Sequence, residues 1–353
     1  MYIEWLQIQR VRNLDDIQFK PNPRINVFVG KNASGKTAIL EGIYLLARAR
    51  SFRTPRIQEV IQKEQKELRV LAKIQHEKTG LIQTGLEKSY GQFSIRRNKE
   101  PVKTVSDQAS HIPIVLITQD TSTIITGPPS VRRHWLDWAM FHVEPNYLSH
   151  WKAYIKALRQ RNQLLKNKEK NQQIYRGWEQ AMVESAYQIN TQREQFLLGL
   201  RDTLRRVGDD YLTKHTEVKL VQGWPEERSL QEVLEDSREN DREKGFTRAG
   251  IHSADIGFTQ EGRKISASFS RGQIKLYAMF LIMAQAREIF LRTEVKPVIL
   301  IDDFRAELDQ DNSDYLLTWL YQQEFQAFLT TTEIPPKNAY TFQEFHVEQG
   351  NFQ

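Results

Sequence analysis

The segment from Gly30 to Thr37 combines glycines, a lysine and a hydroxyl at the spacing of a phosphate-binding loop. It fits the pattern G-x-x-x-x-G-K-[ST] at every fixed position and consists of Gly30, Lys31, Asn32, Ala33, Ser34, Gly35, Lys36 and Thr37. In such a loop, glycines let successive backbone N–H groups face phosphate oxygens, and the following helix adds its positive end. We expect Lys36 to neutralise the β- and γ-phosphates and Thr37 to offer its hydroxyl to Mg²⁺. The loop therefore predicts a site for a nucleoside triphosphate and Mg²⁺.

Two consecutive aspartates follow a short apolar run near the C-terminus. Asp302 and Asp303 come directly after the apolar residues 298–301. A buried strand that ends in an acid is what a magnesium–nucleotide site requires. We expect Asp302 to hold Mg²⁺, and Asp303 to orient or deprotonate the attacking water beside Lys36. Because most of the chain separates Lys36 from Asp302, a large insertion divides the two halves of the site.

Strands and helices must bring these residues together. Apolar alternation or continuous apolar runs predict strands, at residues 2–8, 16–19, 25–29, 68–117 (with hairpins, the last strand at 112–117), 298–301 and 327–330. Helical spacing predicts a helix over 39–46 directly after the loop, and another over 131–143 with Ser130 as its N-cap. A further helix, buried, is expected after Ser270.

The middle of the chain indicates a helical hairpin with a concentration of positive charge. Apolar stripes over 147–158 and 178–204 predict two antiparallel helices of about 25 residues, joined near 167–173, in an arm about 40 Å long. The formal net charge of the chain is only +6, yet one segment of the arm holds eight bases and a single acid. The bases are Lys152, Lys156, Arg159, Arg161, Lys166, Lys168, Lys170 and Arg176. They favour a polyanionic partner, although a solvated helix face explains them equally well.

Composition excludes several other classes of protein. The 353 residues contain no cysteine, which excludes a disulfide scaffold, a zinc ribbon and a cysteine nucleophile, and fits a cytoplasmic location. The N-terminus lacks the features of a secretory signal, and the longest apolar run, 276–283, is too short to cross a bilayer, so we expect no membrane association. The histidines His134, His142 and His150 lack close acids at ligand spacing, so we expect no metal cluster there.

Three further motifs resemble those of ABC/SMC-type ATPases. Ser270 and Gly272 open a helix, as in the signature that binds the γ-phosphate held by a second subunit. Asp309 ends a segment, 306–309, that resembles the loop crossing such a dimer interface. Gln119 matches the glutamine that serves catalysis and the metal. The usual switch histidine is replaced by Thr331 or Thr332, depending on the alignment of the motif.

Other motifs, in their order along the chain, are similar to those of the RecF family, bacterial recombination and gap-repair ATPases. They are Arg12-Asn13-Leu14, Ser51-Phe52-Arg53, the pattern from Gly127 through Arg132-Arg133 to Asp137, and Gly250-x-His252-x-x-Asp255. The resemblance adds Arg12 and Asn13 to the nucleotide-binding residues. The sequence departs from the family pattern at Val11, Ala33, Gln119 and Ile251.

The resemblance implies an α/β fold, an ABC/SMC-type P-loop ATPase head. Its mixed β core lobe would comprise 1–118 plus 297–353, and a largely helical second lobe would be inserted at 119–296. It also implies weak ATP hydrolysis, ATP-dependent homodimerisation, and binding to double-stranded, gapped or junction DNA. The resemblance further implies that the protein acts with RecO and RecR to load the recombinase.

In this hypothesis, Lys36, Thr37 and Asp302 hold ATP from one side, and Ser270 and Gly272 of a second copy close the site. Basic side chains would then contact DNA phosphates without sequence preference, namely Lys152, Lys156 and Arg159, with Arg132 and Arg133 as the next candidates. Two alternatives share the nucleotide motifs. One is the nucleotide-binding subunit of a membrane transporter, and the other is an SMC-like DNA clamp with negligible turnover.

Overall fold

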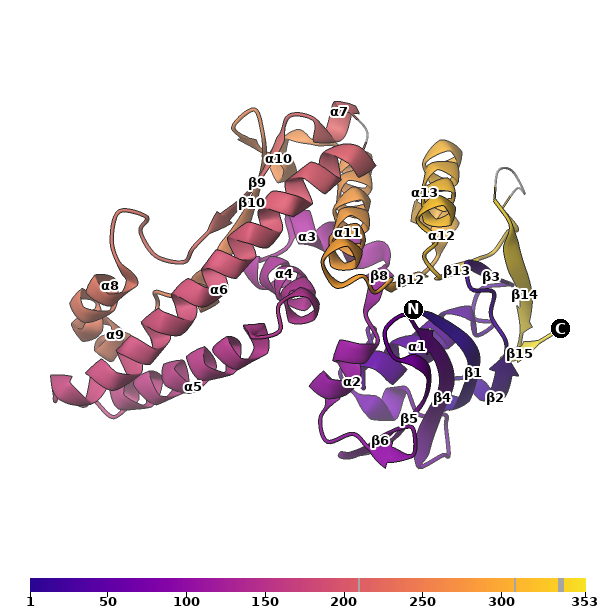
Figure 1. Cartoon of the computed structure of the whole chain (residues 1–353), viewed down its shortest axis with the longest axis horizontal. Helices are drawn as coiled ribbons and strands as arrows, with labels where there is room; N and C mark the ends of the chain where they lie inside the picture. Colours follow the sequence, from indigo (N-terminus) through magenta and orange to yellow (C-terminus); the bar gives the residue numbers. More distant parts are fainter. Residues whose placement is uncertain (209, 308, 336–339) are drawn as a thin grey trace. The chain divides into compact units, whose positions relative to one another are not determined.

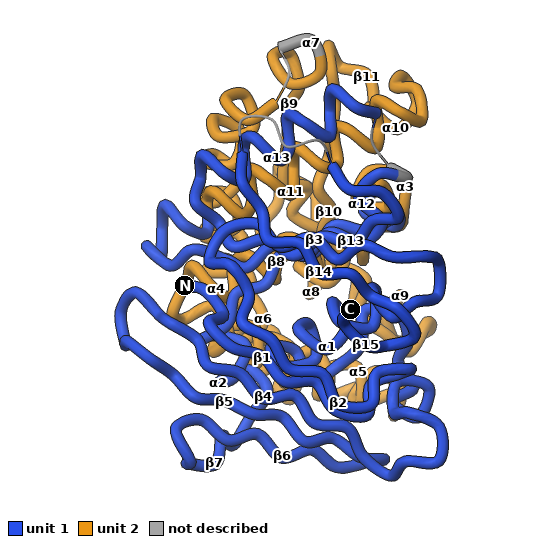
Figure 2. The backbone as a smooth tube through the Cα atoms, turned by 90° about the vertical axis from the view of Figure 1, so that its right-hand side faces the viewer, with its two compact units in different colours: residues 1–121, 289–353 blue, residues 122–288 orange. Residues whose placement is uncertain are grey.

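In the computed structural model, the described residues (1–208, 210–307, 309–335 and 340–353) form two compact units of mixed α/β structure (Figures 1 and 2). Unit 1 comprises residues 1–121 and 289–353, and unit 2 comprises residues 122–288. Both units contain helices and strands. None of the helices within the described ranges is long and apolar enough to span a bilayer.

A largely parallel sheet in unit 1 carries the two motifs that we expect to bind nucleotide. Its strand order is β15 (Asn351–Phe352), β14 (Phe342–Glu348), β3 (Ile25–Val29), β13 (Ala327–Thr331), β12 (Val298–Ile301) and β8 (Ile114–Ile117). Strands β14 through β8 are mutually parallel, and every residue of β3, β12 and β13 is buried. Because parallel strands end at the same edge of a sheet, the residues after β3, β12 and β13 meet there.

An antiparallel sheet forms the other half of the unit 1 core. Its order is β2 (Leu14–Phe19), β1 (Tyr2–Val11), β4 (Glu67–His76), β5 (Gly80–Ser89), β6 (Gln92–Arg97) and β7 (Glu100–Pro101). Helix α1 (Lys36–Arg48) contacts strands of both sheets and is buried along nearly its whole length. Other helical elements of unit 1 are α2 (Val105–His111), α12 (Phe304–Glu307), α13 (Gln310–Gln323) and a short 3-10 helix at Ile57–Glu59, and a second 3-10 helix, Gln119–Ser122, lies at the boundary with unit 2. The strand expected at 112–117 begins at Ile114, because Ile112 terminates α2.

Unit 2 is mainly helical. It contains α3 (Thr123–Thr126), α4 (Pro129–Val143), α5 (Tyr147–Lys166), α6 (Gln172–Val207), α7 (Asp210–Thr213), α8 (Leu230–Asp236), α9 (Arg238–Lys244) and α10 (Ile265–Ser268). A small antiparallel sheet has the order β11 (Arg263–Lys264), β10 (Asp255–Gln260) and β9 (Thr216–Val221). Helix α11 (Arg271–Thr293) runs from unit 2 into unit 1 and contains the buried segment expected after Ser270.

The helical hairpin is present, but two sequence-based predictions about this unit are wrong. Helices α5 and α6 pack side by side (Figure 1), with 20 and 36 residues instead of about 25 each. The longer helix has buried positions from Tyr175 to Val207, so its apolar stripe extends beyond both ends of the expected one. Ser130 is not the N-cap of α4: the helix begins at Pro129, two residues before the expected start at 131, and the fixed φ and missing N–H of proline suit a first helical position.

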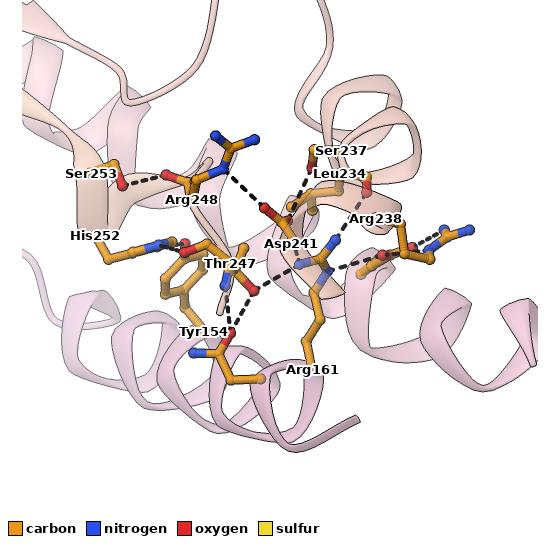
Figure 3. Close-up of polar contacts among 12 residues, drawn as sticks. Tyr154, Arg161, Leu234, Ser237, Arg238, Asp241, Thr247, Arg248, His252 and Ser253 are labelled. Carbon is orange, nitrogen blue, oxygen red and sulfur yellow. Dashed lines mark hydrogen bonds and ion pairs between the residues drawn. The ribbon is translucent and has the colours of Figure 1, made fainter. Parts of the chain in front are cut away.

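Arg161 lies at the centre of a buried polar network in unit 2 (Figure 3). Its guanidinium donates to Glu179 at 3.0 Å, to Asp241 at 2.8 Å and to the Thr247 hydroxyl at 2.8 Å. A fourth bond reaches the Leu234 carbonyl at 3.0 Å. Arg161, Glu179 and Asp241 have fully buried side chains. This arginine belongs to the basic segment of the sequence, yet buried carboxylates inside the protein neutralise its charge.

Each carboxylate of the network also bonds to a second arginine. Arg238 donates to Glu179 at 2.6 Å, and Arg248 donates to Asp241 at 3.3 Å. Buried ions are tolerated when they are paired and hydrogen-bonded in this way. The network therefore fastens the segment from α8 to residue 248 onto helices α5 and α6 (Figure 3).

Replacing Arg161 with methionine should lower the free energy of unfolding by about 3–5 kcal/mol, because Glu179 and Asp241 would each lose a buried partner. The matched control is Arg159→Met, which removes an exposed arginine two residues earlier on the same helix and should change stability by about 0.5 kcal/mol or less. Urea denaturation followed by circular dichroism measures both variants. Equal effects of the two substitutions would contradict this account.

Candidate nucleotide-binding site

The loop between β3 and α1 has the backbone shape that its sequence predicts. Gly35 is the N-cap of α1 with φ of 115°, in the region that favours glycine. A Cβ on Gly30 would lie 2.3 Å from the carbonyl oxygen of Val347, so no side chain fits there. Ala33, where related ATPases often have glycine, also has a positive φ, of 65°. The loop is tied down by a bond from the Gly350 N–H to the Ser34 carbonyl at 2.8 Å.

Lys36 extends over the same loop. Its ammonium donates to the carbonyl oxygens of Gly30 at 2.7 Å and Lys31 at 2.8 Å, and the residue is 8% exposed. Burial lowers the pKa of Lys36, and the negative charges of Asp303 and Asp302 oppose this shift. The loop therefore holds the Lys36 ammonium beside the N-terminal end of α1, an arrangement that suits phosphate groups.

Two hydroxyl side chains meet at the Asp302 carboxylate. The hydroxyls of Thr37 and Thr330 both donate to Asp302 Oδ1, at 2.8 Å and 2.7 Å. The Thr330 hydroxyl also accepts the Asp303 N–H at 2.8 Å. Asp303 has φ of 53°, and its Oδ2 lies 3.4 Å from the Gln119 amide nitrogen. The ends of β12 and β13, with α1 and the segment after β8, thus assemble one polar group.

Thr330 is the functional candidate that the sequence did not identify. The sequence-based candidates on this strand were the next two residues, but the Thr331 hydroxyl donates instead to the Glu333 carbonyl at 3.0 Å, and Thr332 is exposed. The sequence does show a hydroxyl residue, Thr330, at the end of the expected strand. It can be assigned to the site only once β13 is known to pair with β12.

Arg12 and Asn13 lie beside the N-terminal half of α1. Arg12 donates to both carboxylate oxygens of Glu41, at 2.8 Å and 3.0 Å, and Glu41 is fully buried on α1. The hydrogen bond to Glu41 raises the pKa of Arg12. Ser51 also bonds to Glu41, which ties the following loop to α1. The Asn13 side chain is 3.1 Å from the position that a Cβ on Gly35 would occupy.

These groups surround a cavity of about 690 Å³ in unit 1. Its lining includes Arg12, Asn13, Asn32, Ala33, Ser34, Gly35, Lys36, Thr37, Phe52, Arg53, Gln119, Asp302, Asp303 and Thr330. The volume is within the usual range for small-molecule sites. Within the described residues, the buried Ser34 hydroxyl has no hydrogen-bond partner, so a ligand could satisfy it.

The residues present fit a nucleoside triphosphate with Mg²⁺. Glycines, helix N–H groups and Lys36 suit the phosphates, while the Thr37 hydroxyl and the Asp302 carboxylate are hard oxygen ligands only 2.8 Å apart. The described part of the chain holds no group of three or more His, Cys, Asp or Glu side chains that could bind a metal unaided. Mg²⁺ would therefore take its other ligands from phosphate and water, as is usual for this ion.

Ser270, Gly272 and Asp309 are not among the residues that line the cavity. Ser270 belongs to unit 2 and forms a reciprocal cap on α11: its hydroxyl accepts the Gln273 N–H at 3.3 Å, and its own N–H donates to Gln273 Oε1 at 2.8 Å. Gly272 is exposed in the first turn of that helix. Asp309 is exposed and caps α13. Leu308, in the same expected loop as Asp309, lies outside the described residues.

The candidate DNA-binding residues occupy two kinds of environment in unit 2. Lys152, Lys156 and Arg159 are exposed along α5. Arg132, in contrast, is 9% exposed and donates to Asp255 at 2.6 Å and 3.0 Å. Arg133 donates to the Ala254 carbonyl at 2.7 Å. The exposed stripe is thus open to a partner, whereas Arg132 and Arg133 are bonded to the start of β10.

The chain is similar to known proteins along nearly its whole length. The family model for the RecF/RecN/SMC N-terminal domain matches residues 2–340. The DNA replication and repair protein RecF of Nitrosococcus oceani is 36% identical to this chain over 99% of it and 98% of the relative. The RecF protein of Cellvibrio japonicus is 31% identical with the same coverage.

Solved structures show the same fold. A structure of the recombination mediator protein RecF-ATP in the RecFOR pathway has a TM-score of 0.88 and 24% identity, covering 100% of this chain and 97% of the other. A crystal structure of the SmcHead bound to the C-winged helix domain of ScpA has a TM-score of 0.59 and 15% identity, with 100% and 96% coverage. They confirm the expected ABC/SMC-type head. By the family model and the sequence relatives together, the chain belongs to the RecF family of DNA replication and repair proteins.

Proposed function

We propose that this protein is a cytoplasmic, DNA-binding ATPase of recombinational gap repair and replication restart. In this proposal it hydrolyses ATP weakly, dimerises with ATP on double-stranded or junction DNA, and helps to load the recombinase with RecO and RecR. The observation that carries the proposal is the meeting of Lys36, Thr37, Asp302 and Asp303 around one cavity. Family membership and the relative solved as RecF-ATP support it.

Six side chains of the cavity have assigned tasks in hydrolysis. Lys36 and the loop N–H groups bind the phosphates, while Thr37 and Asp302 hold Mg²⁺, which supplies charge neutralisation at the phosphates. Asp303 orients the attacking water or accepts its proton, and Gln119, 3.4 Å from Asp303, positions that carboxylate. Thr330 acts as a positioning residue, because its hydroxyl fixes both the Asp302 carboxylate and the Asp303 backbone.

A second copy of the chain would complete the site through Ser270 and Gly272. Ser270 is exposed at the N-terminal end of the 23-residue helix α11, where backbone N–H groups attract an anion. Asp309 would lie at the same interface. ATP then stabilises the dimer by binding both copies, and hydrolysis releases them.

The DNA-binding role rests on the charge of α5. Lys152, Lys156 and Arg159 recur at helical spacing and are exposed, so they form a stripe that suits a phosphate backbone. Arg132 and Arg133 remain weaker candidates, since both bond to residues of unit 2.

Family membership does not favour the transporter alternative. A clamp with negligible turnover differs from this proposal only in its rate, which a multiple-turnover phosphate-release assay measures.

Replacing Thr330 with valine should lower the rate of ATP hydrolysis by roughly 10- to 100-fold while ATP affinity stays within about threefold, because the hydroxyl positions the two acids without holding the nucleotide. Thr330→Ser retains the hydroxyl and should retain turnover. Phosphate release and equilibrium binding of a fluorescent ATP analogue separate the two effects. Turnover of Thr330→Val at the wild-type rate would remove Thr330 from the mechanism.

Two substitutions of Ser270 separate its capping role from a contact with phosphate. Aspartate and asparagine both cap helices well, but aspartate places a negative charge where the γ-phosphate of the second copy should lie. We expect Ser270→Asp to weaken ATP-dependent dimerisation by about tenfold or more, and Ser270→Asn to weaken it far less. Sedimentation velocity with ATP and Mg²⁺ measures the dimer. Dimerisation of the aspartate variant at the wild-type level would place this interface elsewhere.

Reversing the charges of Lys152, Lys156 and Arg159 to glutamate should weaken DNA binding. It should also reduce the slope of log affinity against log salt concentration by about 2 to 3, since each lost phosphate contact contributes about 0.9. Fluorescence anisotropy with duplex DNA at several salt concentrations gives both quantities. Reversal of the exposed Lys63, Lys66 and Lys73 in unit 1 is the control for net charge. An equal slope change in the control would move the DNA site away from α5.

A further inference from the structure

Phe246 is a large aromatic side chain that remains 50% exposed between α9 and β10. A single exposed aromatic is common on protein surfaces and needs no explanation by itself. Phe246 differs in two respects, which are the rigidity of its backbone and the charge of its neighbours. Together they indicate what the exposed ring can bind.

The residues on both sides of Phe246 are fixed by hydrogen bonds. Gly245 ends α9 in the left-handed region, with φ of 76°, and its N–H donates to the Asp241 carbonyl at 2.8 Å. Thr247 is buried, and both its N–H and its hydroxyl donate to Asn162 Oδ1 of α5, at 2.8 Å and 2.7 Å. The ring is therefore presented from a rigid segment, which reduces the entropy lost when a ligand stacks on it.

The buried network of Figure 3 supplies this rigidity. The Thr247 hydroxyl accepts from Arg161 at 2.8 Å, and the Thr247 carbonyl bonds to His252 at 2.9 Å. Arg161 and His252 thus hold the residue beside Phe246 from two directions (Figure 3).

A cation lies two residues after the ring and is exposed like it. Exposure alternates along residues 246–249: Phe246 and Arg248 are exposed, while Thr247 and Ala249 are buried. Arg248 donates to Asp241 at 3.3 Å through Nε, and its side chain is still 47% exposed. The terminal nitrogens of its guanidinium point away from Asp241 (Figure 3).

The segment also adjoins the basic stripe of α5. A Cβ on Gly245 would lie 3.6 Å from Cγ of Lys166, so the turn packs against the last turn of that helix. Lys166 is exposed and lies 14 residues after Lys152, or about four helical turns, so it continues the face of Lys152, Lys156 and Arg159. Lys244 adds an exposed base, and Glu243 is the single acid in residues 242–248.

An exposed aromatic ring beside a row of basic side chains matches one ligand chemistry, that of single-stranded nucleic acid. Bases stack on the ring while cations contact the phosphates, and stacking accepts any base. A duplex contacts the basic side chains of α5 through its phosphates. Its nucleobases are paired and stacked, so none has a free face until the duplex ends. We propose that Phe246 stacks an unpaired DNA base where a duplex lying along α5 passes into single strand, with Arg248 and Lys166 on the adjoining phosphates. This inference rests on the proposed DNA-binding function and assigns its preference for junctions to one residue.

The experiment compares a blunt duplex with the same duplex carrying a single-stranded overhang, by fluorescence anisotropy on the full chain. Phe246→Ala should weaken binding to the overhang DNA by about 5- to 150-fold and leave the blunt duplex within about twofold, because base stacking on an aromatic contributes roughly 1–3 kcal/mol. The salt slope should not change, since no charge is removed. Phe246→Trp should keep the wild-type preference.

Two matched variants separate stacking from other roles. Phe246→Leu keeps an apolar residue after the C-cap of α9 but has no aromatic face, so it should behave as Phe246→Ala does. Lys166→Gln should instead weaken binding to both DNAs and lower the salt slope by about one. Thermal unfolding checks that each variant is folded.

The outcomes distinguish this inference from the proposed function. If the wild-type protein binds neither DNA, the DNA-binding function itself is wrong. If the wild type prefers the overhang and Phe246→Ala keeps that preference, only the stacking role is overturned. An equal loss of affinity for both DNAs in Phe246→Ala also overturns it. So does a Phe246→Leu variant that still prefers the overhang DNA, because that preference would not need an aromatic ring. Loss of a protein partner with DNA binding intact would assign Phe246 to that partner instead.

Discussion

The Asp302 carboxylate is the point at which separate parts of unit 1 are joined. Its Oδ1 accepts hydroxyl bonds from Thr37 at the start of α1 and from Thr330 at the end of β13, so three segments distant in sequence converge on one atom. The same Thr330 hydroxyl fixes the N–H of Asp303, which has a left-handed backbone. The parallel order β3–β13–β12 makes this convergence possible, because β13 lies between the strand before the phosphate loop and the strand before the acids. A metal and a water would therefore be placed by groups that already hydrogen-bond to one another within unit 1.

Unit 2 uses buried charge for a different purpose. Arg161 and Arg238 neutralise Glu179, while Arg161 and Arg248 neutralise Asp241, and the bonds hold α8, α9 and the following segment against the long hairpin. A hairpin of long helices offers a surface but little internal stiffness at its far end. The network holds that end through buried ion pairs, so the exposed basic side chains of α5 extend from a helix that is fixed to its neighbours.

The sequence predicted the local elements of the nucleotide site and missed what depended on strand pairing. The loop residues and the strand before Asp302 were specified by motifs whose spacing reflects local geometry. Thr330 was missed because its role appears only when β13 is placed beside β12. Arg161 was misassigned to an exposed basic segment, although a signal was present: Tyr154, Ala157, Arg161 and Leu165 share the buried face of α5 at steps of three and four. Net charge along a segment does not distinguish faces, whereas periodicity does.

The same contacts explain family motifs that lie outside the cavity. A Cβ on Gly250 would lie 2.1 Å from the Tyr154 hydroxyl, and that hydroxyl is 2.6 Å from His252 Nδ1. Burial lowers the pKa of His252, which favours the neutral ring. Because the Thr247 carbonyl can only accept, Nε2 carries the proton and Nδ1 accepts from Tyr154. Asp255, which ends this motif, binds Arg132 of the preceding family motif and begins the strand that leads through β11 and α10 to Ser270. The glycine, histidine and aspartate therefore hold a chain segment in position, and none of the three lines the nucleotide cavity.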